Sequence, residues 1–154
     1  MNHSRWMSQA YELACKAYQE GEVPVGAVIV HGPSDELISC GYNGVERQKN
    51  ALVHAEVVAI EDACKTIGDK FLNECDLYVT LEPCMMCASA ISLVRIRRLY
   101  FGAYDPKTGG VEHGPRIYQS NSCHHKPEVI GGVIEEECGL LMRKFFENCR
   151  DTHH

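Results

Sequence analysis

Two short motifs hold the side chains in this sequence that could bind a metal ion. The segment His54-Ala55-Glu56 combines an imidazole with a carboxylate, and Pro83-Cys84-Met85-Met86-Cys87 places two thiols three residues apart. Thiols at this spacing share one face of a helix, and the N-terminal end of a helix favours their thiolate forms. Two thiolates and one imidazole suit a soft cation with tetrahedral geometry, for which zinc is the natural candidate. If His54, Cys84 and Cys87 are the ligands, the fourth position stays open to water.

An open position distinguishes a catalytic zinc site from a structural one. Water bound to zinc has a pKa of about 7 and becomes a nucleophile near neutral pH. Glu56 would then carry protons during the reaction. Residues two apart on a regular helix point about 200° away from each other, so His54 and Glu56 can serve one site only if His54 lies in the first turn of its helix.

Each motif taken alone has other interpretations. A Cys-x-x-Cys pair can also be a redox-active dithiol or half of a closed structural zinc site, and a single His-x-Glu carries little information. His-x-Glu followed about 25 to 30 residues later by Pro-Cys-x-x-Cys is, however, the pattern of zinc-dependent base deaminases. A non-catalytic zinc module that binds RNA or a protein partner is a further alternative. Glu56 argues against that alternative, because a structural site does not need a carboxylate beside the metal.

Both motifs are expected at helix starts within a mixed α/β fold. Hydrophobic periodicity predicts helices over residues 5–20, 54–67, 84–94 and 134–149, a short helix near 116–119, and strands over 23–30, 37–42, 77–81, 98–102 and 128–133. This order predicts a three-layer α/β/α sandwich with a mixed five-stranded sheet, formed as a single domain by residues 1–154. The segment 43–53 is polar and aperiodic and is expected to be a loop. The helix 84–94 is apolar on nearly every side, which predicts a central position.

Composition limits the class of protein. The 154 residues contain no apolar segment of about 18 residues, and the N-terminal residues lack the apolar centre of a signal peptide. We therefore expect a soluble, cytoplasmic protein that does not interact with membranes. The nine cysteines are expected to be reduced there. Cys64 and Cys138 lie on apolar helix stripes and are expected to be small buried side chains.

The charge distribution leaves the kind of substrate open. A net charge of −6 argues against a nucleic-acid partner, but residues 93–126 contain six Lys or Arg against two Asp or Glu. A local positive face could hold phosphate groups on a protein that is acidic overall.

On the two motifs, the sequence resembles the cytidine and deoxycytidylate deaminase superfamily, and within it the tRNA-specific adenosine deaminases of bacteria. The similarity extends over most of the chain. It includes Glu22-Val-Pro-Val-Gly-Ala27, Gly41-Tyr42-Asn43, Leu77-Tyr-Val-Thr-Leu-Glu-Pro-Cys-Met-Met-Cys87, Phe101-Gly-Ala-Tyr-Asp-Pro-Lys-Thr-Gly109 and the segment 135–146.

The resemblance implies a cytidine deaminase-like fold and a role for individual residues. His54, Cys84 and Cys87 would hold one zinc ion per subunit, and Glu56 would shuttle protons. Asn43 would hydrogen-bond the purine.

The Phe101–Gly109 segment would border the substrate pocket. Ala103 and Asp105 would then contact the target nucleotide and its 5′ neighbour. Phe146 lies off the apolar stripe of the last helix and is expected to face RNA or a partner, whereas Phe145 lies on the stripe and is expected in the core. Phosphate contacts are expected among the basic residues Arg95, Arg97, Arg98, Lys107, Arg116 and Lys126.

The function implied by the resemblance is hydrolytic deamination of adenosine to inosine at the wobble position (34) of tRNA, with the arginine tRNA that carries an ACG anticodon as the expected target. The expected partners are the anticodon stem-loop and a second copy of the chain in a homodimer; DNA is not expected. The alternative is a deaminase of the same fold that acts on a free base or nucleotide, such as guanine, cytosine or deoxycytidylate. The segment Phe101–Gly109 and the Phe145-Phe146 pair favour RNA, whereas the negative net charge favours the small substrate.

Overall fold

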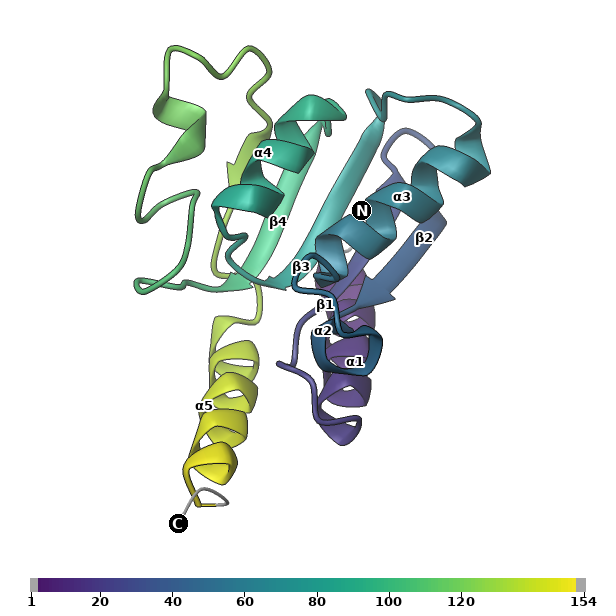
Figure 1. Ribbon diagram of the computed structural model, residues 1–154. Coiled ribbons are helices and arrows are strands. Elements are labelled where there is room, and N and C mark those ends of the chain that lie inside the picture. The colour runs from purple at the N-terminus through teal and green to yellow at the C-terminus, as the bar shows by residue number, and fades with distance from the viewer. Residues whose placement is uncertain (1–2, 152–154) are drawn as a thin grey trace.

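A five-stranded mixed sheet forms the centre of the computed structural model, which describes residues 3–151 (Figure 1). The strands are β1 (Gly26–His31), β2 (Glu36–Tyr42), β3 (Cys75–Leu81), β4 (Arg98–Ala103) and β5 (Glu128–Ile130). Their order across the sheet is β2-β1-β3-β4-β5. β1 runs antiparallel to β2 and β3, whereas β3, β4 and β5 run parallel to one another. The carboxyl ends of the parallel strands therefore meet at one end of the sheet.

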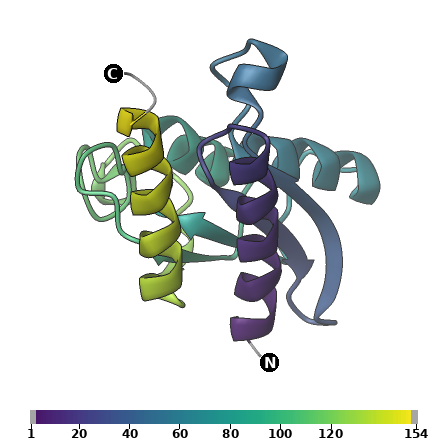
Figure 2. The same ribbon diagram turned by 90° about the horizontal axis from the view of Figure 1, so that it is seen from below.

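Helices cover both faces of the sheet. α3 (Ala55–Ile67) and α4 (Met85–Leu93) pack on one face, and α1 (His3–Gln19) and α5 (Glu135–Asp151) lie side by side on the other, as Figure 2 shows. Each face has its own apolar core. The core under α3 and α4 includes the fully buried Ile29, Leu77, Ile91, Leu99 and Phe101, and the core under α1 includes Trp6, Met7, Val28, Tyr78 and Tyr100. The predicted three-layer sandwich is confirmed.

The short helix α2 (Val45–Gln48) forms where the sequence predicted a loop. The buried carboxylate of Glu22 accepts hydrogen bonds from the backbone N–H groups of Glu46 at 2.9 Å and Arg47 at 2.8 Å. These are N–H groups of the first turn, which have no partner within a helix. A distant residue therefore stabilises α2, which is why local sequence does not show it.

The predicted central position of α4 is wrong. Only Cys87, Ala88 and Ile91 are buried, whereas the side chains of Met85 and Leu93 are 62% and 74% exposed. A helix that is apolar all round gives no indication of which side faces the core. α4 packs one side on the sheet and presents an apolar outer side, as helices at interfaces between chains do.

Other expectations agree more closely with the structure. The 3-10 turn at Ile117–Gln119 lies where a short helix was predicted, and β5 ends before Gly131, earlier than expected. All nine cysteines are free thiols. Cys138 is buried as predicted, whereas Cys64, also expected to be buried, is only partly buried at the edge of the core. Over residues 3–151 there is no helix with the length and apolarity that crossing a membrane requires.

Candidate metal centre and substrate pocket

Both metal-binding motifs begin helices, as the sequence predicted. His54 is the N-cap of α3 with extended backbone angles (φ −86°, ψ 150°), and Cys84 is the N-cap of α4 (φ −68°, ψ 175°). The backbone N–H of Ala55 in the first turn of α3 donates to Oδ1 of Asn43 at 2.8 Å. His54 therefore meets the condition under which it and Glu56 can serve one site.

The imidazole and the two thiols converge at distances that fit zinc. Nδ1 of His54 lies 3.6 Å from Sγ of Cys84 and 3.6 Å from Sγ of Cys87. Bonds of about 2.0–2.1 Å to nitrogen and about 2.3 Å to sulfur, at the tetrahedral angle, separate the two ligand atoms by about 3.6 Å. The ring of His54 also hydrogen-bonds to the backbone of Ala51, and a bond of this kind orients a metal-binding imidazole. Among residues 3–151, these three side chains form the one group of His, Cys, Asp or Glu with such close ligand atoms.

The pKa of one thiol favours the binding of a cation. A hydrogen bond from Cys87, together with one from His54, lowers the pKa of Cys84 to about 4, although burial opposes this shift. The hydrogen bond between the two cysteines raises the pKa of Cys87, and the hydrogen bond between His54 and Cys84 raises the pKa of His54. The site therefore holds a thiolate at neutral pH, which is the form that binds zinc.

Glu56 lies in the first turn of α3 and is 4% exposed. Burial raises the pKa of its carboxyl group to about 7, although a backbone hydrogen bond at its own residue opposes the shift. A carboxyl group that is half protonated near neutral pH can both accept and return a proton, as a general acid and base must.

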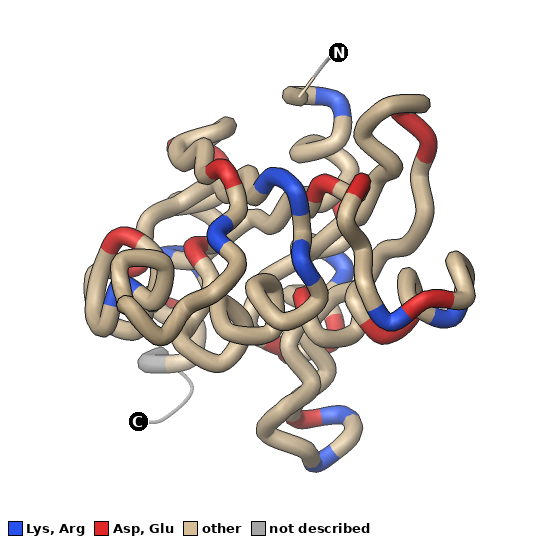
Figure 3. The backbone as a smooth tube through the Cα atoms, turned by 90° about the horizontal axis from the view of Figure 1, so that it is seen from above, with Lys and Arg blue, Asp and Glu red and all other residues tan. Residues whose placement is uncertain are grey.

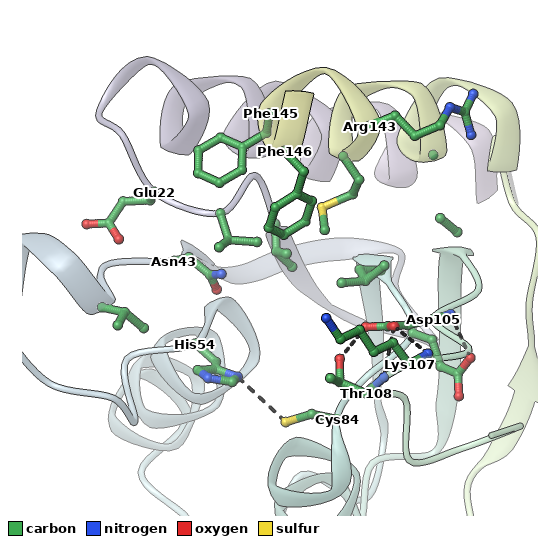
Figure 4. Close-up of a pocket in the computed structure, with 18 of the residues that line it drawn as sticks. Glu22, Asn43, His54, Cys84, Asp105, Lys107, Thr108, Arg143, Phe145 and Phe146 are labelled. Atoms are coloured by element: carbon green, nitrogen blue, oxygen red, sulfur yellow. Dashed lines mark hydrogen bonds between the residues drawn. The ribbon is translucent and has the colours of Figure 1, made fainter. Parts of the chain in front are cut away.

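A pocket of about 870 Å³ opens above the three metal-binding side chains (Figure 4). The residues that line it include Asn43, His54, Glu56 and Cys84, together with Ala103, Asp105, Lys107 and residues of α5. The structure thus brings all the predicted substrate-binding residues to one cavity. A volume of this size accommodates a nucleoside and part of its neighbours.

Two of these residues also have contacts with the protein itself. Oδ1 of Asn43 accepts the N–H of Ala55, so the part of Asn43 that remains for a ligand is the amide NH2 group, a donor. The carboxylate of Asp105 accepts the backbone N–H groups of Lys107 at 3.2 Å and Thr108 at 3.0 Å and the Thr108 hydroxyl at 2.6 Å. Asp105 therefore shapes its own loop.

The aromatic pair of α5 differs in part from the sequence prediction. Phe146 is 45% exposed and lines the pocket, and its contact with RNA stays a prediction. Phe145, expected in the core, also lines the pocket and packs its ring against Tyr18 of α1, with a distance of 5.7 Å between ring centroids. The apolar stripe of α5 extends past the edge of the sheet, so its C-terminal half covers the pocket instead of the core (Figures 1 and 4).

The predicted phosphate-binding residues are not equivalent. Arg97 forms a bidentate ion pair with the buried Asp76, and Arg98 pairs with Glu128 at 2.9 Å. Both ion pairs lie where strands β3, β4 and β5 begin, and the phosphate contacts expected of the two arginines stay predictions. Lys107 lines the pocket. Figure 3 shows basic residues interspersed with acidic ones along the chain.

Sequence reasoning missed one residue beside the site. Glu82 directly follows β3 and precedes Pro83 and Cys84, and its side chain is completely buried. Burial raises its pKa, but hydrogen bonds from the backbone N–H of Asp105, from His113 and from two further N–H groups outweigh burial, so the pKa is lowered overall. The sequence offered one signal, a glutamate at the end of an apolar strand where burial is expected.

Comparisons with known proteins agree with the site. A family model described as the cytidine and deoxycytidylate deaminase zinc-binding region matches residues 1–103. The tRNA-specific adenosine deaminase of Rickettsia typhi is 47% identical over 146 residues, which cover 95% of this chain and 99% of that protein. The tRNA-specific adenosine deaminase of Bacillus subtilis is 42% identical over 145 residues, with 94% and 89% covered.

Solved structures resemble the fold to different degrees. One from studies of A-to-I editing by tRNA:A34 deaminases at the wobble position of transfer RNA has a TM-score of 0.87 and 43% identity, and the match covers 90% of this chain and 99% of the other. A guanine deaminase of Bacillus subtilis has a TM-score of 0.63 and 39% identity, and that match covers 68% of this chain and 66% of the other.

Proposed function

The chain belongs to the cytidine and deoxycytidylate deaminase family, and we propose that it is the zinc-dependent hydrolase that converts adenosine to inosine at the wobble position (34) of tRNA. The observation that carries this proposal is the buried carboxyl group of Glu56 beside the His54, Cys84 and Cys87 side chains, at the base of a pocket of about 870 Å³. The relatives with that printed activity are similar over nearly their whole length.

Each residue of the site has a role in this reaction. His54, Cys84 and Cys87 would hold zinc, which supplies a water molecule of lowered pKa. Glu56 would take a proton from the attacking water molecule and pass it to ring nitrogen N1 of adenine, since its own pKa is about 7. Asn43 would orient the purine through its amide NH2 group. The water oxygen would form a bond to C6 and the bond from C6 to the amino nitrogen would break. The amino group would take the second proton of the water and leave as ammonia, and the product would be inosine.

RNA recognition is assigned to the opposite wall of the pocket. Ala103 and Asp105 contact the target nucleotide and its 5′ neighbour, Lys107 neutralises phosphate, and Phe146 stacks on a base or ribose. The anticodon stem-loop is the bound part of the tRNA, because an unpaired loop base can be turned into a pocket at low cost. The arginine tRNA with an ACG anticodon is the proposed target.

We also propose that the chain acts as a homodimer in the cytoplasm and that residues 1–154 form a single deaminase domain. The exposed apolar residues Met85 and Leu93 on the outer side of α4 support an interface between two copies. The free thiols suit a reducing compartment.

The alternative function is deamination of a free base. It is favoured by the 39% identity to a guanine deaminase and by the net charge of −6. That match covers about two thirds of each chain, whereas the matches to tRNA-specific adenosine deaminases cover nearly all of both. The position of Phe146 and Lys107 at the pocket also favours RNA.

One experiment separates the two functions. Zinc-loaded protein is incubated with an anticodon stem-loop that has adenosine at position 34, and in parallel with free guanine, cytosine and deoxycytidylate. Inosine is measured by mass spectrometry after nuclease digestion. A stem-loop with the adenosine moved by one nucleotide and the Glu56→Ala protein serve as controls. Inosine at position 34 alone supports the proposal; turnover of a free base without inosine in the RNA would show that the alternative is correct.

A further inference from the structure

We propose that Glu82 is a positioning residue for RNA binding, because its buried carboxylate fixes the loop of residues 104–113 that forms the wall of the substrate pocket opposite His54. This inference rests on the proposed function and deepens it. Glu82 determines how tightly the RNA is held, whereas His54 and Glu56 serve the chemical step.

The carboxylate of Glu82 is the hydrogen-bond acceptor for four backbone N–H groups of this loop. Oε1 accepts the N–H of Asp105 at 3.0 Å and lies 2.8 Å from Nδ1 of His113. Oε2 accepts the N–H groups of Val111 at 3.2 Å, Glu112 at 3.0 Å and His113 at 3.1 Å. The two ends of the loop are therefore held by one side chain. An ordinary loop of this length turns such N–H groups toward water.

The backbone beside Glu82 holds the middle of the same loop. The N–H of Gly110 donates to the carbonyl oxygen of Pro83 at 2.8 Å, and Cys84 pairs with Gly109 in an isolated antiparallel bridge. A Cβ atom at Gly109 would lie 2.3 Å from Oε2 of Glu82, so the approach of loop and carboxylate requires glycine there. The position of the loop is thus tied to the position of the metal-binding Cys84.

The part of the loop that faces the pocket has a fixed internal shape. The Asp105 carboxylate holds the backbone of Lys107 and Thr108, and all three residues line the cavity (Figure 4). Internal bonds determine this shape, but only a contact outside the segment can determine where it lies relative to His54. The hydrogen bond from Asp105 N–H to Glu82 is such a contact.

Glutamine cannot replace this carboxylate. The glutamine amide has only one oxygen, whereas both carboxylate oxygens of Glu82 accept backbone N–H groups. In one orientation the NH2 group of glutamine would face the N–H of Asp105. In the other it would face the N–H groups of Val111, Glu112 and His113. Buried N–H groups without an acceptor are costly, so the loop would move to find water. The metal ligands and Glu56 lie at the starts of α3 and α4, whose buried side chains, such as Ala59 and Ile91, belong to the core on the sheet. The contacts that tie Pro83 and Cys84 to the loop are backbone contacts, which the Glu82 side chain does not make. The expected loss is therefore in RNA affinity.

The test compares Glu82→Gln with Asp76→Asn. Asp76 is an equally buried carboxylate near the start of β3, the strand that Glu82 follows, and it pairs with Arg97 at the far end from the pocket. Its variant therefore reports general destabilisation. Zinc content, KM and kcat for the anticodon stem-loop are measured for both. We expect Glu82→Gln to keep zinc, raise KM about ten-fold and change kcat less than about three-fold, because positioning without a role in chemistry affects binding. Asp76→Asn should leave KM unchanged.

Hydrogen exchange observes the loop directly. In Glu82→Gln the amides of residues 105 and 111–113 should exchange at least about ten-fold faster, and those of α4 should not. If Glu82→Gln does not fold, His113→Ala removes one contact of the carboxylate and should raise KM by a smaller factor.

Unchanged KM, a loss confined to kcat, or unchanged exchange of these amides would overturn the positioning role. If the wild-type protein leaves position 34 unmodified, the proposed function fails, and exchange together with stem-loop binding by fluorescence anisotropy still decides the role of Glu82.

Discussion

Oδ1 of Asn43 accepts a hydrogen bond from the backbone N–H of Ala55 at 2.8 Å. This bond joins the residue after β2 to the first turn of α3, between His54 and Glu56. Asn43 is 8% exposed and reaches both the helix and the pocket. One side chain therefore binds the helix start with its oxygen and leaves its NH2 group for the purine of the proposed reaction.

Asn43→Asp separates these two functions. Aspartate keeps the acceptor for Ala55 and suits the positive end of a helix, so thermal stability and zinc content should stay close to wild type. It has no NH2 group for the purine, and loss of one such donor typically reduces activity about 10²-fold. Asn43→Ala should lose stability as well. Wild-type kcat/KM in Asn43→Asp would contradict the assignment of the NH2 group to the substrate.

Replacement of Glu56 tests the proton carrier. Glu56→Gln has the same shape and removes the proton-accepting group, so deamination should fall by about 10² to 10⁴-fold. Its stability should be equal or slightly higher, because burial already disfavours the charged carboxylate. Zinc by mass spectrometry, melting temperature and single-turnover kinetics are the measurements. Substantial turnover in Glu56→Gln would mean that another group moves the proton.

Zinc removal tests the metal centre. Dialysis against a chelator should abolish deamination, and addition of zinc should restore it. None of the three metal-binding side chains belongs to either apolar core, so circular dichroism should retain helix and strand while the melting temperature falls. Cys84→Ser and His54→Ala should each reduce the zinc content below one ion per chain. Full activity in metal-free protein would exclude the proposed role of these residues.

The sequence predicted what depends on local patterns and missed what depends on distant partners. His54 and Cys84 were expected at helix starts because motif spacing and hydrophobic periodicity are local, and both are there. Glu82 was missed because its partners are 23 to 31 residues further along the chain. The helix α2 was missed because Glu22 stabilises it from 24 residues away. The exposed outer side of α4 could not be predicted, since apolar side chains on all sides give no direction.

The aromatic pair of α5 should separate binding from stability. Phe146 is partly exposed at the pocket. Phe146→Ala should raise KM for the stem-loop about ten-fold, because one stacking contact with the RNA is lost. The melting temperature should change little, because the side chain is partly exposed. Phe145 packs against Tyr18, so Phe145→Ala should lower the melting temperature as well. Equal KM values for Phe146→Ala and wild type would show that RNA does not contact Phe146.

Alkaline pH should destabilise the protein through Cys138, which anchors the first turns of α5. Burial, followed by the charges of Glu137 and Cys15, raises the pKa of this thiol from 9.0 to about 12. The folded state thus binds the proton more tightly than the unfolded state, so this contribution to stability is complete below pH 9 and is lost as the pH rises from 9 toward 12. By pH 10.5 the loss should be about 1 to 2 kcal/mol of unfolding free energy.

Cys138→Ala removes the titration, so its unfolding free energy, measured by urea denaturation, should fall less between pH 8 and pH 10.5 than that of wild type. Parallel curves for the two proteins would contradict the effect, because other groups that ionise in this range are present in both.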